Sequence, residues 1–406
     1  MIRSRRKLVD LADRGPLRTM FIVTSMPVGG LETLLVNLMC RVDRSRIEPE
    51  LCCLKDLGPL GTMLSREVNA FSNLTGNKYD VRVLGRLTKL LRERRIDAIV
   101  TAGTGGDRMF WGRLAAWFAG CPVILSAIHS TGLPNKVEPL NRMLAPITDG
   151  FIAVAETHAT YLAEHEGCPE RKVFVVPNGV DTRRFSPQEP DASLRSNLGL
   201  PLGAPIAAIV AALRPEKNHE LFLESAALIR KVRRDARFLV IGDGPLREEL
   251  EARASQLGIG DAVHFLGTRS DIPELLGLTD VLMLTSHMEA NPVSVLEALA
   301  CAKPVVATQV GSLGEVVQDG ATGYLVRPGD AKALADRVIT LFNDPARAQG
   351  LGRRGRSLVE SKWSLEQMVV GYEDLITEIY MTKYRRNIKR DPRNISVPGR
   401  EEHVAR

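Results

Sequence analysis

The sequence is poor in the features that mark several specialised classes of protein. Only 6 of its 406 residues are cysteine, and 5% are aromatic. No two cysteines are spaced as Cys-x-x-Cys, which argues against a zinc module and against a disulfide-stapled secreted domain. No apolar run approaches the roughly 20 residues that a membrane-spanning helix needs. Residues 1–20 are basic but have no apolar stretch behind them, so they do not resemble a secretory signal.

The composition that remains is that of a folded globular protein. Of the residues, 44% are hydrophobic and 25% are charged, with 34 glycines and 23 prolines. Because globular domains hold roughly 100–200 residues each, this length predicts two domains. Most of the cysteines stand in apolar surroundings, which suits a reducing compartment, and we expect the protein to be cytoplasmic.

The net charge of +6 belongs to the two ends of the chain. Residues 1–18 carry a charge of +4 and residues 383–406 carry +5, which leaves −3 for the residues between them. Since no folded basic face is indicated, we expect no nucleic-acid partner. Basic tails are usually only solvated, but they also suit peripheral contact with the anionic inner face of a membrane, where each Lys or Arg contributes about 1 kcal/mol. The amphipathic stretch 81–95 leaves the same two interpretations open.

From residue 19 onward, short apolar runs alternate with longer stretches of helical period, and this alternation restarts after a polar stretch. The pattern is typical of parallel sheets covered by helices on both faces. The sequence therefore predicts an α/β fold of two Rossmann-like, doubly wound domains that face a central cleft. The predicted order is a basic tail (1–18), an N-terminal domain (19–180), a linker (181–204), a second domain (205–364), a C-terminal helix that packs back on the first domain (365–382) and a basic disordered tail (383–406).

One segment, residues 286–330, holds two glutamates in a setting that suits a ligand. Glu289 follows an apolar, strand-like run, and Glu297 lies further on, in the first turns of a helix that Pro292 introduces. The free N–H groups at the start of such a helix attract an anion, whereas carboxylates beside it repel one. The natural partners of the two carboxylates are therefore hydroxyl groups, such as those of a sugar and a ribose. The alternative is that both are solvated surface acids.

A second segment, residues 210–229, places two cations on the loop before a helix. Arg214 and Lys217 follow the first apolar run of the second domain. An Arg fork and a Lys point charge at this position suit a diphosphate, although ordinary surface cations look the same in sequence. The chain has neither an Asp-x-Asp sequence nor a His/Cys cluster, so we expect no bound metal and no cofactor.

Glycine and histidine add weaker signals near the ends of other strands. Gly30, after the first apolar run and before a helix, allows a ligand to approach the backbone closely. Gly242 and Gly244 begin a dinucleotide fingerprint, but Arg247 stands at its third glycine, so a nicotinamide cofactor is not indicated. His129 ends an apolar run at the expected rim of the cleft, where a lone histidine is more often structural than chemical.

Taken together, these segments resemble the family 4 retaining glycosyltransferases, which have the GT-B fold and use nucleotide sugars. The resemblance spans roughly residues 19–380 and is densest in 286–330. There the two glutamates, the Leu-Glu-Ala around the second, Lys303-Pro304-Val305-Val306, Gly311, Glu315, Gly320 and Gly323 fall in the family's order. Supporting stretches are VPNGVDTRRF (176–185), PEKN (215–218), IGDGP (241–245), FLG (265–267) and DVLMLTS (280–286).

The resemblance implies a role for each candidate residue. Glu289 would contact the donor sugar at the reacting centre, and Glu297 would bind the nucleotide ribose. Lys217 would hold the diphosphate, Gly30 would form the loop that closes over it, and His129 would lie on the acceptor side of the transferred sugar. The further donor-binding positions are Arg269 beside the base and the backbone amides of Ala290, Asn291, Val293 and Ser294.

The sequence departs from the family's pattern at several positions. The family's usual Arg five residues before the clamp lysine is Ala212 here, and Arg214 stands two residues on, where an extended chain points it to the same side. Ala290 replaces the usual glycine after the first glutamate, and Ser312-Leu313 replace a glycine-rich pair. The stretch TAGTGGDR (101–108) replaces a histidine-containing loop, so the family's choice of acceptor does not transfer.

The sequence thus predicts a retaining glycosyltransferase that moves a sugar from a nucleoside diphosphate to an acceptor hydroxyl without a metal. Its predicted catalytic residues are Glu289, His129, Lys217 and Arg214. The family implies a glycan or lipid-linked acceptor and a place in bacterial polysaccharide or glycolipid assembly, in the cytoplasm or at the inner face of the membrane. The alternatives are a nucleotide-sugar epimerase of the same architecture, a non-catalytic nucleotide-sugar-binding subunit, and a membrane-surface scaffold bound through the basic tails.

Overall fold

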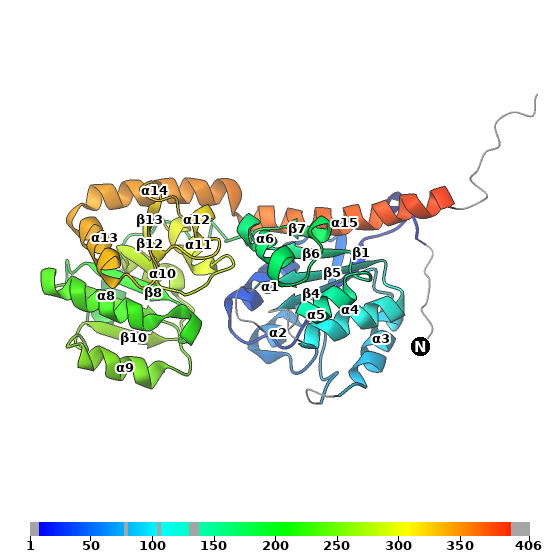
Figure 1. Cartoon of the computed structure of the whole chain (residues 1–406), viewed down its shortest axis with the longest axis horizontal. Helices are drawn as coiled ribbons and strands as arrows, with labels where there is room; N and C mark the ends of the chain where they lie inside the picture. The colour runs from blue at the N-terminus through cyan, green and yellow to red at the C-terminus, as the bar shows by residue number, and fades with distance from the viewer. Residues whose placement is uncertain (1–7, 77–79, 104–106, 130–137, 391–406) are drawn as a thin grey trace, which may run out of the picture.

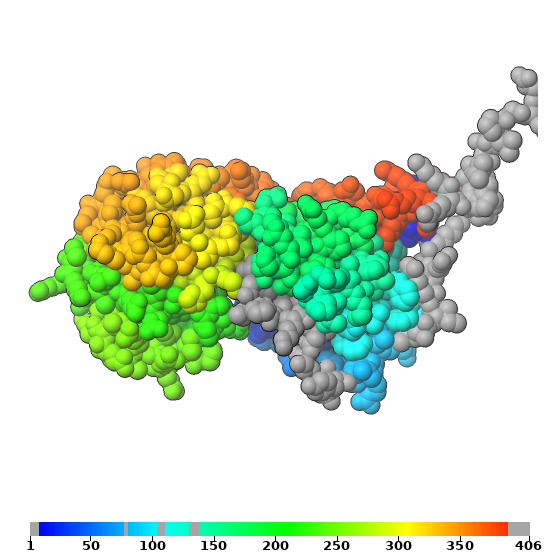
Figure 2. All heavy atoms as spheres, in the orientation of Figure 1, coloured from blue at the N-terminus to red at the C-terminus, as the bar shows by residue number. Residues whose placement is uncertain are grey.

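The computed structural model describes residues 8–76, 80–103, 107–129 and 138–390, and these form two lobes side by side (Figure 1). The space-filling view shows the same two masses, with the C-terminal helix running along one side of the first (Figure 2). Residues 1–7 and 391–406 of the basic tails, and residues 104–106 of the stretch 101–108, lie outside the described part of the chain.

The first lobe, called the N-lobe here, is built on a parallel sheet with strand order β3-β2-β1-β4-β5-β6-β7. Its strands are β1 (Leu17–Val23), β2 (Ile47–Cys53), β3 (Asn69–Phe71), β4 (Ala98–Gly103), β5 (Val123–Ile128), β6 (Gly150–Ala153) and β7 (Val173–Val175). Its helices are α1 (Gly30–Arg41), α2 (Gly58–Leu64), α3 (Val83–Glu93), α4 (Asp107–Ala119), α5 (Glu138–Leu144) and α6 (Glu156–His165).

The second lobe, called the C-lobe here, is built on a parallel sheet with strand order β10-β9-β8-β11-β12-β13. Its strands are β8 (Ile206–Val210), β9 (Arg237–Ile241), β10 (Val263–Gly267), β11 (Val281–Leu284), β12 (Val305–Thr308) and β13 (Gly323–Val326). Its helices are α7 (Ala192–Asn197), α8 (His219–Val232), α9 (Arg247–Gln256), α10 (Ile272–Leu278), α11 (Val293–Ala300), α12 (Leu313–Val316), α13 (Ala331–Asn343) and α14 (Pro345–Lys362).

Helices cover both faces of the N-lobe sheet, and strand β1 shows why the sequence folds this way. Phe21 and Val23 pack with α1 on one face, whereas Met20 and Ile22 pack with α3 and α4 on the other. A strand buried on both faces needs apolar residues at every position rather than at alternate ones. The continuous apolar runs in the sequence are therefore the central strands, and the predicted α/β fold of two Rossmann-like domains is confirmed.

The strand order fixes where a ligand is expected in each lobe. Successive strands are added toward one edge of the sheet up to a point and then toward the other edge. This reversal lies between β1 and β4 in the N-lobe and between β8 and β11 in the C-lobe. In doubly wound sheets, ligands bind outside the carboxyl ends of the strands at this reversal. The loops that matter are therefore those after β1, β8 and β11, which hold Gly30, Lys217 and Glu289 respectively.

The chain passes between the lobes at two segments, near residue 180 and near residue 364, and these two segments are hydrogen-bonded to each other. The N–H of Val180 donates to the carbonyl of Trp363 at 2.9 Å, and the N–H of Leu365 donates to the carbonyl of Val180 at 2.9 Å. Gly179 lies so close to this second segment that an added Cβ would stand 2.5 Å from the carbonyl oxygen of Ser364. After it, α15 (Leu365–Arg390) runs back along the N-lobe, where its apolar residues join the N-lobe core (Figure 1).

Several elements differ from what the sequence indicates. Helix α2 and strand β3 lie in residues 56–80, where the sequence by itself predicts a long polar loop, and α7 lies within the expected linker. Strand β1 begins at Leu17, inside the expected N-terminal tail, and α15 continues to Arg390, beyond the expected helix end at Thr382. These elements are short or polar, so packing against a neighbour rather than a strong local pattern sets them.

None of the helices in the described part of the chain is apolar over a length that would cross a bilayer.

Candidate active site

The centre of the site is an ion pair between the loops after β8 and β11. Lys217 Nζ lies 2.6 Å from Glu289 Oε1, and the Ser286 hydroxyl donates to the same oxygen at 2.6 Å. The Glu289 side chain is only 6% exposed, whereas that of Lys217 is 26% exposed. A short, charge-assisted contact to a nearly buried carboxylate fixes both groups at the reversal point of the C-lobe sheet. The two segments that the sequence singled out separately therefore meet.

Backbone contacts hold these loops together from behind. The N–H of His287 donates to the carbonyl of Glu216 at 2.9 Å, and the hydroxyl of Thr285 donates to the carbonyl of Asn218 at 2.9 Å. On the other side, Gly311 has a φ of 51°, and an added Cβ would collide with the carbonyl oxygen of Glu289. Only glycine fits this close approach without strain. The position of Glu289 is therefore set by three loops.

Helix α11 begins next to the ion pair. Pro292 precedes its first residue, and the N–H groups of Val293 and Ser294 stand in its first turn, where no earlier helical carbonyl can accept them. Such groups attract a negatively charged ligand. Ala290 and Asn291 are each 6% exposed and lead into this turn. The structure thus places the predicted amides of residues 290–294 beside Lys217 and Glu289.

Asn291 also reaches across to the N-lobe. Its Nδ2 donates to the carbonyl of Val154 at 3.1 Å, and its own carbonyl accepts from Asn178 Nδ2 at 2.9 Å. Asn291 Oδ1 is buried and has no hydrogen-bond partner. Val154 follows the carboxyl end of β6, so the carboxyl edges of the two sheets face each other here.

Glu297 lies one turn further along α11. Its surroundings lead to a second group of charged residues, which consists of Arg184, Arg269 and Asp271. Burial raises the pKa of the Glu297 carboxyl from 4.5 to about 8, an effect that the nearby positive charge of Arg184 opposes. Arg184 Nη2 donates to the carbonyl of Ser270 at 3.1 Å, in the loop that holds Arg269. Arg269 itself pairs with Asp271, at 2.8 Å for Nε and 2.5 Å for Nη2. Arg184 therefore connects Glu297 to the loop expected to hold the base.

The raised pKa of Glu297 makes a stability measurement informative. Because the folded protein binds this proton more tightly than the unfolded chain, stability is greatest below the ordinary pKa and falls as pH rises through the folded value of about 8. Glu297→Gln mimics the protonated form, so its Tm should gain on that of the wild type between about pH 5 and 8. Thermal denaturation across this range measures the difference, with Glu248→Gln, on exposed α9, as the control. An equal Tm difference at both ends of the range would contradict the assigned burial effect.

The N-lobe brings Gly30 and an acidic residue toward Arg214. Glu32, in the first turn of α1, has a raised pKa because of burial, and the positive charge of Arg214 lowers it in part. Arg214 is exposed and lies on the loop after β8, so the C-lobe cation faces the N-terminus of α1. An added Cβ on Gly30 would meet no heavy atom within 4 Å, whereas one on Gly29 would collide with the Glu32 carboxylate. The space beside Gly30 is thus open.

His129 follows β5 at the N-lobe edge. Its Nε2 atom is buried without a hydrogen-bond partner, and burial lowers the pKa of its imidazole to about 3, with a smaller contribution from His158. His129 is therefore neutral at physiological pH. His158 Nδ1 accepts from the N–H of Val154 at 3.2 Å, the residue whose carbonyl binds Asn291. His129 is thus linked to the loop of Asn291 through His158 and Val154.

The sequence reasoning assigned no role to four residues of this region: Ser286, Asn178, Arg184 and Glu315. Each lies inside a stretch that carries the family resemblance, so its family position was the available signal. Their hydrogen-bond partners lie 3 to 159 residues away along the chain, so most of these contacts form only in the folded chain. Within the described residues, no three His, Cys, Asp or Glu side chains cluster as metal ligands.

Comparison with known proteins identifies the class that this fold and site define. Residues 191–358 match the model of the group 1 glycosyl transferases, and residues 28–184 match that of glycosyltransferase family 4. A mannosyltransferase of Corynebacterium glutamicum, described as GDP-mannose-dependent and acting on a monoacylated phosphatidylinositol monomannoside, is 31% identical over 70% of this chain and 76% of its own length. The chain belongs to the family 4 glycosyltransferases, and it is a glycosyltransferase.

Three further similarities cover more of the chain. An Escherichia coli enzyme, described as a UDP-Gal:alpha-D-GlcNAc-diphosphoundecaprenol alpha-1,3-galactosyltransferase, is 25% identical over 89% of this chain and 97% of its own length. The crystal structure of Anabaena HepE in complex with UDP-glucose superposes with a TM-score of 0.78 at 22% identity, covering 90% of this chain and all of that one. WaaG, described as a glycosyltransferase of lipopolysaccharide biosynthesis, superposes with a TM-score of 0.70 at 17% identity, over 88% of this chain and 99% of its own. These superpositions establish the fold.

Proposed function

We propose that the protein is a retaining, metal-independent glycosyltransferase that uses a nucleoside-diphosphate sugar and transfers its sugar to a hydroxyl of a glycan or lipid-linked acceptor. The observation that supports this most directly is the Lys217–Glu289 pair at 2.6 Å, beside the first turn of α11 and at the reversal point of the C-lobe sheet. A cation, a helix N-terminus and a carboxylate at one point suit a diphosphate joined to a sugar.

In this proposal the C-lobe holds the donor from base to sugar. The loop of Arg269 lies beside the base, Glu297 accepts hydrogen bonds from the ribose, and Lys217 with the amides of Val293 and Ser294 binds the diphosphate. Arg214 adds positive charge from the side that faces α1, which suits its position opposite Glu32. Glu289 hydrogen-bonds the sugar hydroxyls at the reacting centre. Binding to Lys217 then requires that the lysine be shared between the diphosphate and Glu289.

In the reaction that fits these groups, the main charge that develops is the negative charge on the leaving diphosphate. The bond between the anomeric carbon and the diphosphate oxygen breaks, the acceptor oxygen attacks from the same face, and its proton passes to the departing phosphate. Lys217, Arg214 and the helix amides stabilise the charge that develops on the diphosphate. Electrostatic stabilisation by groups that are already in position is usually the largest contribution to catalysis. His129, with a pKa near 3, orients the sugar as a neutral imidazole and is not the base.

A thermal-shift screen tests the donor class. UDP, GDP and their sugars are compared because relatives are described with either nucleotide. A ligand at a hundred times its dissociation constant stabilises the folded protein by about 2.7 kcal/mol, which is a clear rise in Tm. A rise with one nucleoside diphosphate that Lys217→Ala abolishes supports the proposal, and no rise with any of them overturns it. Donor binding accompanied by neither sugar transfer nor slow donor hydrolysis would instead favour a non-catalytic subunit.

Chelation tests the role of fixed cations in place of a metal. We expect transfer to continue at an unchanged rate after treatment with EDTA, because Lys217, Arg214 and the α11 amides supply the positive charge. The measurement is sugar transfer by dialysed protein with EDTA and with added Mg²⁺ or Mn²⁺. Activity that disappears with EDTA and returns with a divalent ion would contradict this part of the proposal.

The proposed peripheral membrane contact through the basic tails has its own test. Removing residues 2–7, which hold four basic residues and no acid, should leave transfer to a soluble acceptor intact and reduce sedimentation with anionic vesicles. Residues 391–406 are unsuitable because they hold three arginines and three acids, and a deletion from residue 383 is unsuitable because Lys383 pairs with Asp149 and donates to the carbonyl of Pro122, both at 2.6 Å. Vesicle binding by a full chain that binds no donor would favour the scaffold interpretation.

A further inference from the structure

Helix α6 of the N-lobe has no N-terminal cap of its own. The residue before it is Ala155, whose side chain cannot accept a hydrogen bond, and no side-chain cap is formed from this position. The first N–H groups of a helix have no partner within the helix, and the helix dipole makes this end positive. Serine, threonine, aspartate or asparagine usually meets this need from the position that Ala155 occupies.

The missing cap is supplied by the other lobe. Glu315, on the short helix α12 of the C-lobe, accepts from the N–H of Thr157 at 2.8 Å and from the N–H of Glu156 at 3.1 Å. Its Oε1 atom also accepts from the Thr157 hydroxyl at 2.6 Å. A single carboxylate thus makes three hydrogen bonds to a helix that lies 158 residues away in the sequence. These bonds exist only while the two lobes are close together.

Each end of this contact leads to a predicted catalytic residue. On the C-lobe side, Ser312 begins the turn of Glu315, and its N–H donates to the carbonyl of Glu289 at 3.2 Å. On the N-lobe side, the turn that Glu315 caps holds His158, which accepts from the N–H of Val154 and lies near His129. The contact therefore connects the donor-side carboxylate with the acceptor-side histidine by a path separate from Asn291.

We propose that Glu315 is a positioning residue that latches the two lobes by capping α6 from the C-lobe, and that this latch aligns Glu289 with His129 for transfer. The alignment part rests on the proposed function, whereas the latch itself does not. Glu315 does not contact the donor in this proposal. Its carboxylate is partly exposed, so the latch is weak enough to open and close as substrates enter and products leave.

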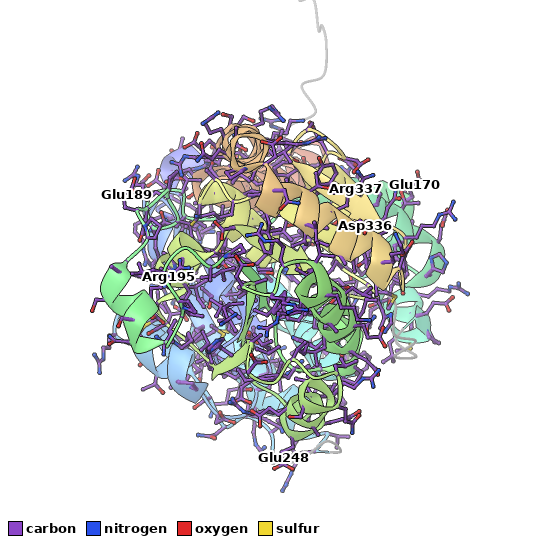
Figure 3. The ribbon with its side chains drawn as sticks, turned by 90° about the vertical axis from the view of Figure 1, so that its left-hand side faces the viewer. Glu170, Glu189, Arg195, Glu248, Asp336 and Arg337 are labelled. Atoms are coloured by element: carbon purple, nitrogen blue, oxygen red, sulfur yellow. The ribbon has the colours of Figure 1, made fainter. Side chains whose placement is uncertain are left out.

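The test uses the whole chain and three variants. Glu315→Ala removes the latch, and Glu315→Ala combined with Ala155→Ser restores a cap from within α6 without restoring the contact between lobes. Glu248→Ala is the matched control, since Glu248 lies in the first turn of α9 on the outer face of the C-lobe (Figure 3). Hydrogen exchange of the Glu156 and Thr157 amides and the radius of gyration from small-angle scattering are measured without substrate. Steady-state transfer gives kcat and the donor KM.

In Glu315→Ala we expect the two amides to exchange about fivefold faster, the radius of gyration to rise, and kcat to fall about fivefold with little change in donor KM. In the double variant, slow exchange should return while kcat stays low. Wild-type exchange rates in Glu315→Ala would overturn the proposal that Glu315 latches the lobes. Full recovery of kcat in the double variant would show that Glu315 only stabilises α6 and does not align the lobes. Failure of the wild type to bind any nucleotide sugar would overturn the proposed function alone, because exchange and scattering still test the latch.

Discussion

Replacing Lys217 by alanine should lower the rate of sugar transfer by about 10²–10³-fold, the loss seen when one preorganised donor is removed from a developing negative charge. Lys217 pairs with Glu289 at 2.6 Å, and among the described residues no other cationic side chain forms an ion pair with that carboxylate. The measurement is kcat for transfer from the donor that the thermal-shift screen identifies.

The same substitution should also weaken the fold slightly, and a second variant separates the two effects. Without Lys217, the nearly buried Glu289 carboxylate keeps only the Ser286 hydroxyl, which costs about 1–3 kcal/mol of unfolding free energy. Adding Glu289→Gln removes that charge and should restore Tm but not transfer. Lys332→Ala, which breaks an exposed pair with Asp336, is the control for losing a lysine (Figure 3 labels Asp336). Full transfer by folded Lys217→Ala would show that this lysine does not bind the diphosphate.

Glu289→Gln should lower kcat at least 100-fold while changing the donor KM little. The amide has the same shape as the carboxylate and can still bond Ser286 and Lys217, so the fold should survive. What it lacks is the negative charge beside a sugar that becomes positive as the diphosphate leaves. An interaction that strengthens only in the transition state affects kcat rather than KM.

Glu297→Gln provides the matched comparison for this prediction. Both residues are glutamates of one segment, but Glu297 is assigned to the ribose, which does not change charge during transfer. Measured at about pH 9, above the Glu297 pKa of about 8, where the native residue is a carboxylate, its substitution should raise the donor KM about tenfold and leave kcat nearly unchanged, as expected for a lost uniform binding interaction. Equal effects of the two substitutions on kcat would contradict the division of roles, and wild-type kcat in folded Glu289→Gln would remove Glu289 from the reacting centre.

The sequence was informative wherever a local pattern decides the structure. The apolar runs at residues 206–210 and 281–284 are strands because they are buried on both faces, and the loops that follow them must therefore lie at the same edge of the C-lobe sheet. At that edge Lys217 and Glu289, which the family resemblance assigns to one donor, lie 2.6 Å apart. The local pattern was not enough for helix α5 or strand β3, which are too short and too irregular to have a periodic signal.

The sequence alone determined the class of fold and the family, and it predicted the residues of the site, because strand and helix periods, glycine positions and motif order are properties of neighbouring residues. The tertiary structure decided which of those residues touch. It set Arg214 opposite Glu32, joined Asn291 to Val154, and gave helix α6 a cap from Glu315 that its own sequence lacks. Such contacts join groups far apart along the chain, so they depend on how the two lobes pack and cross, and no local pattern specifies them.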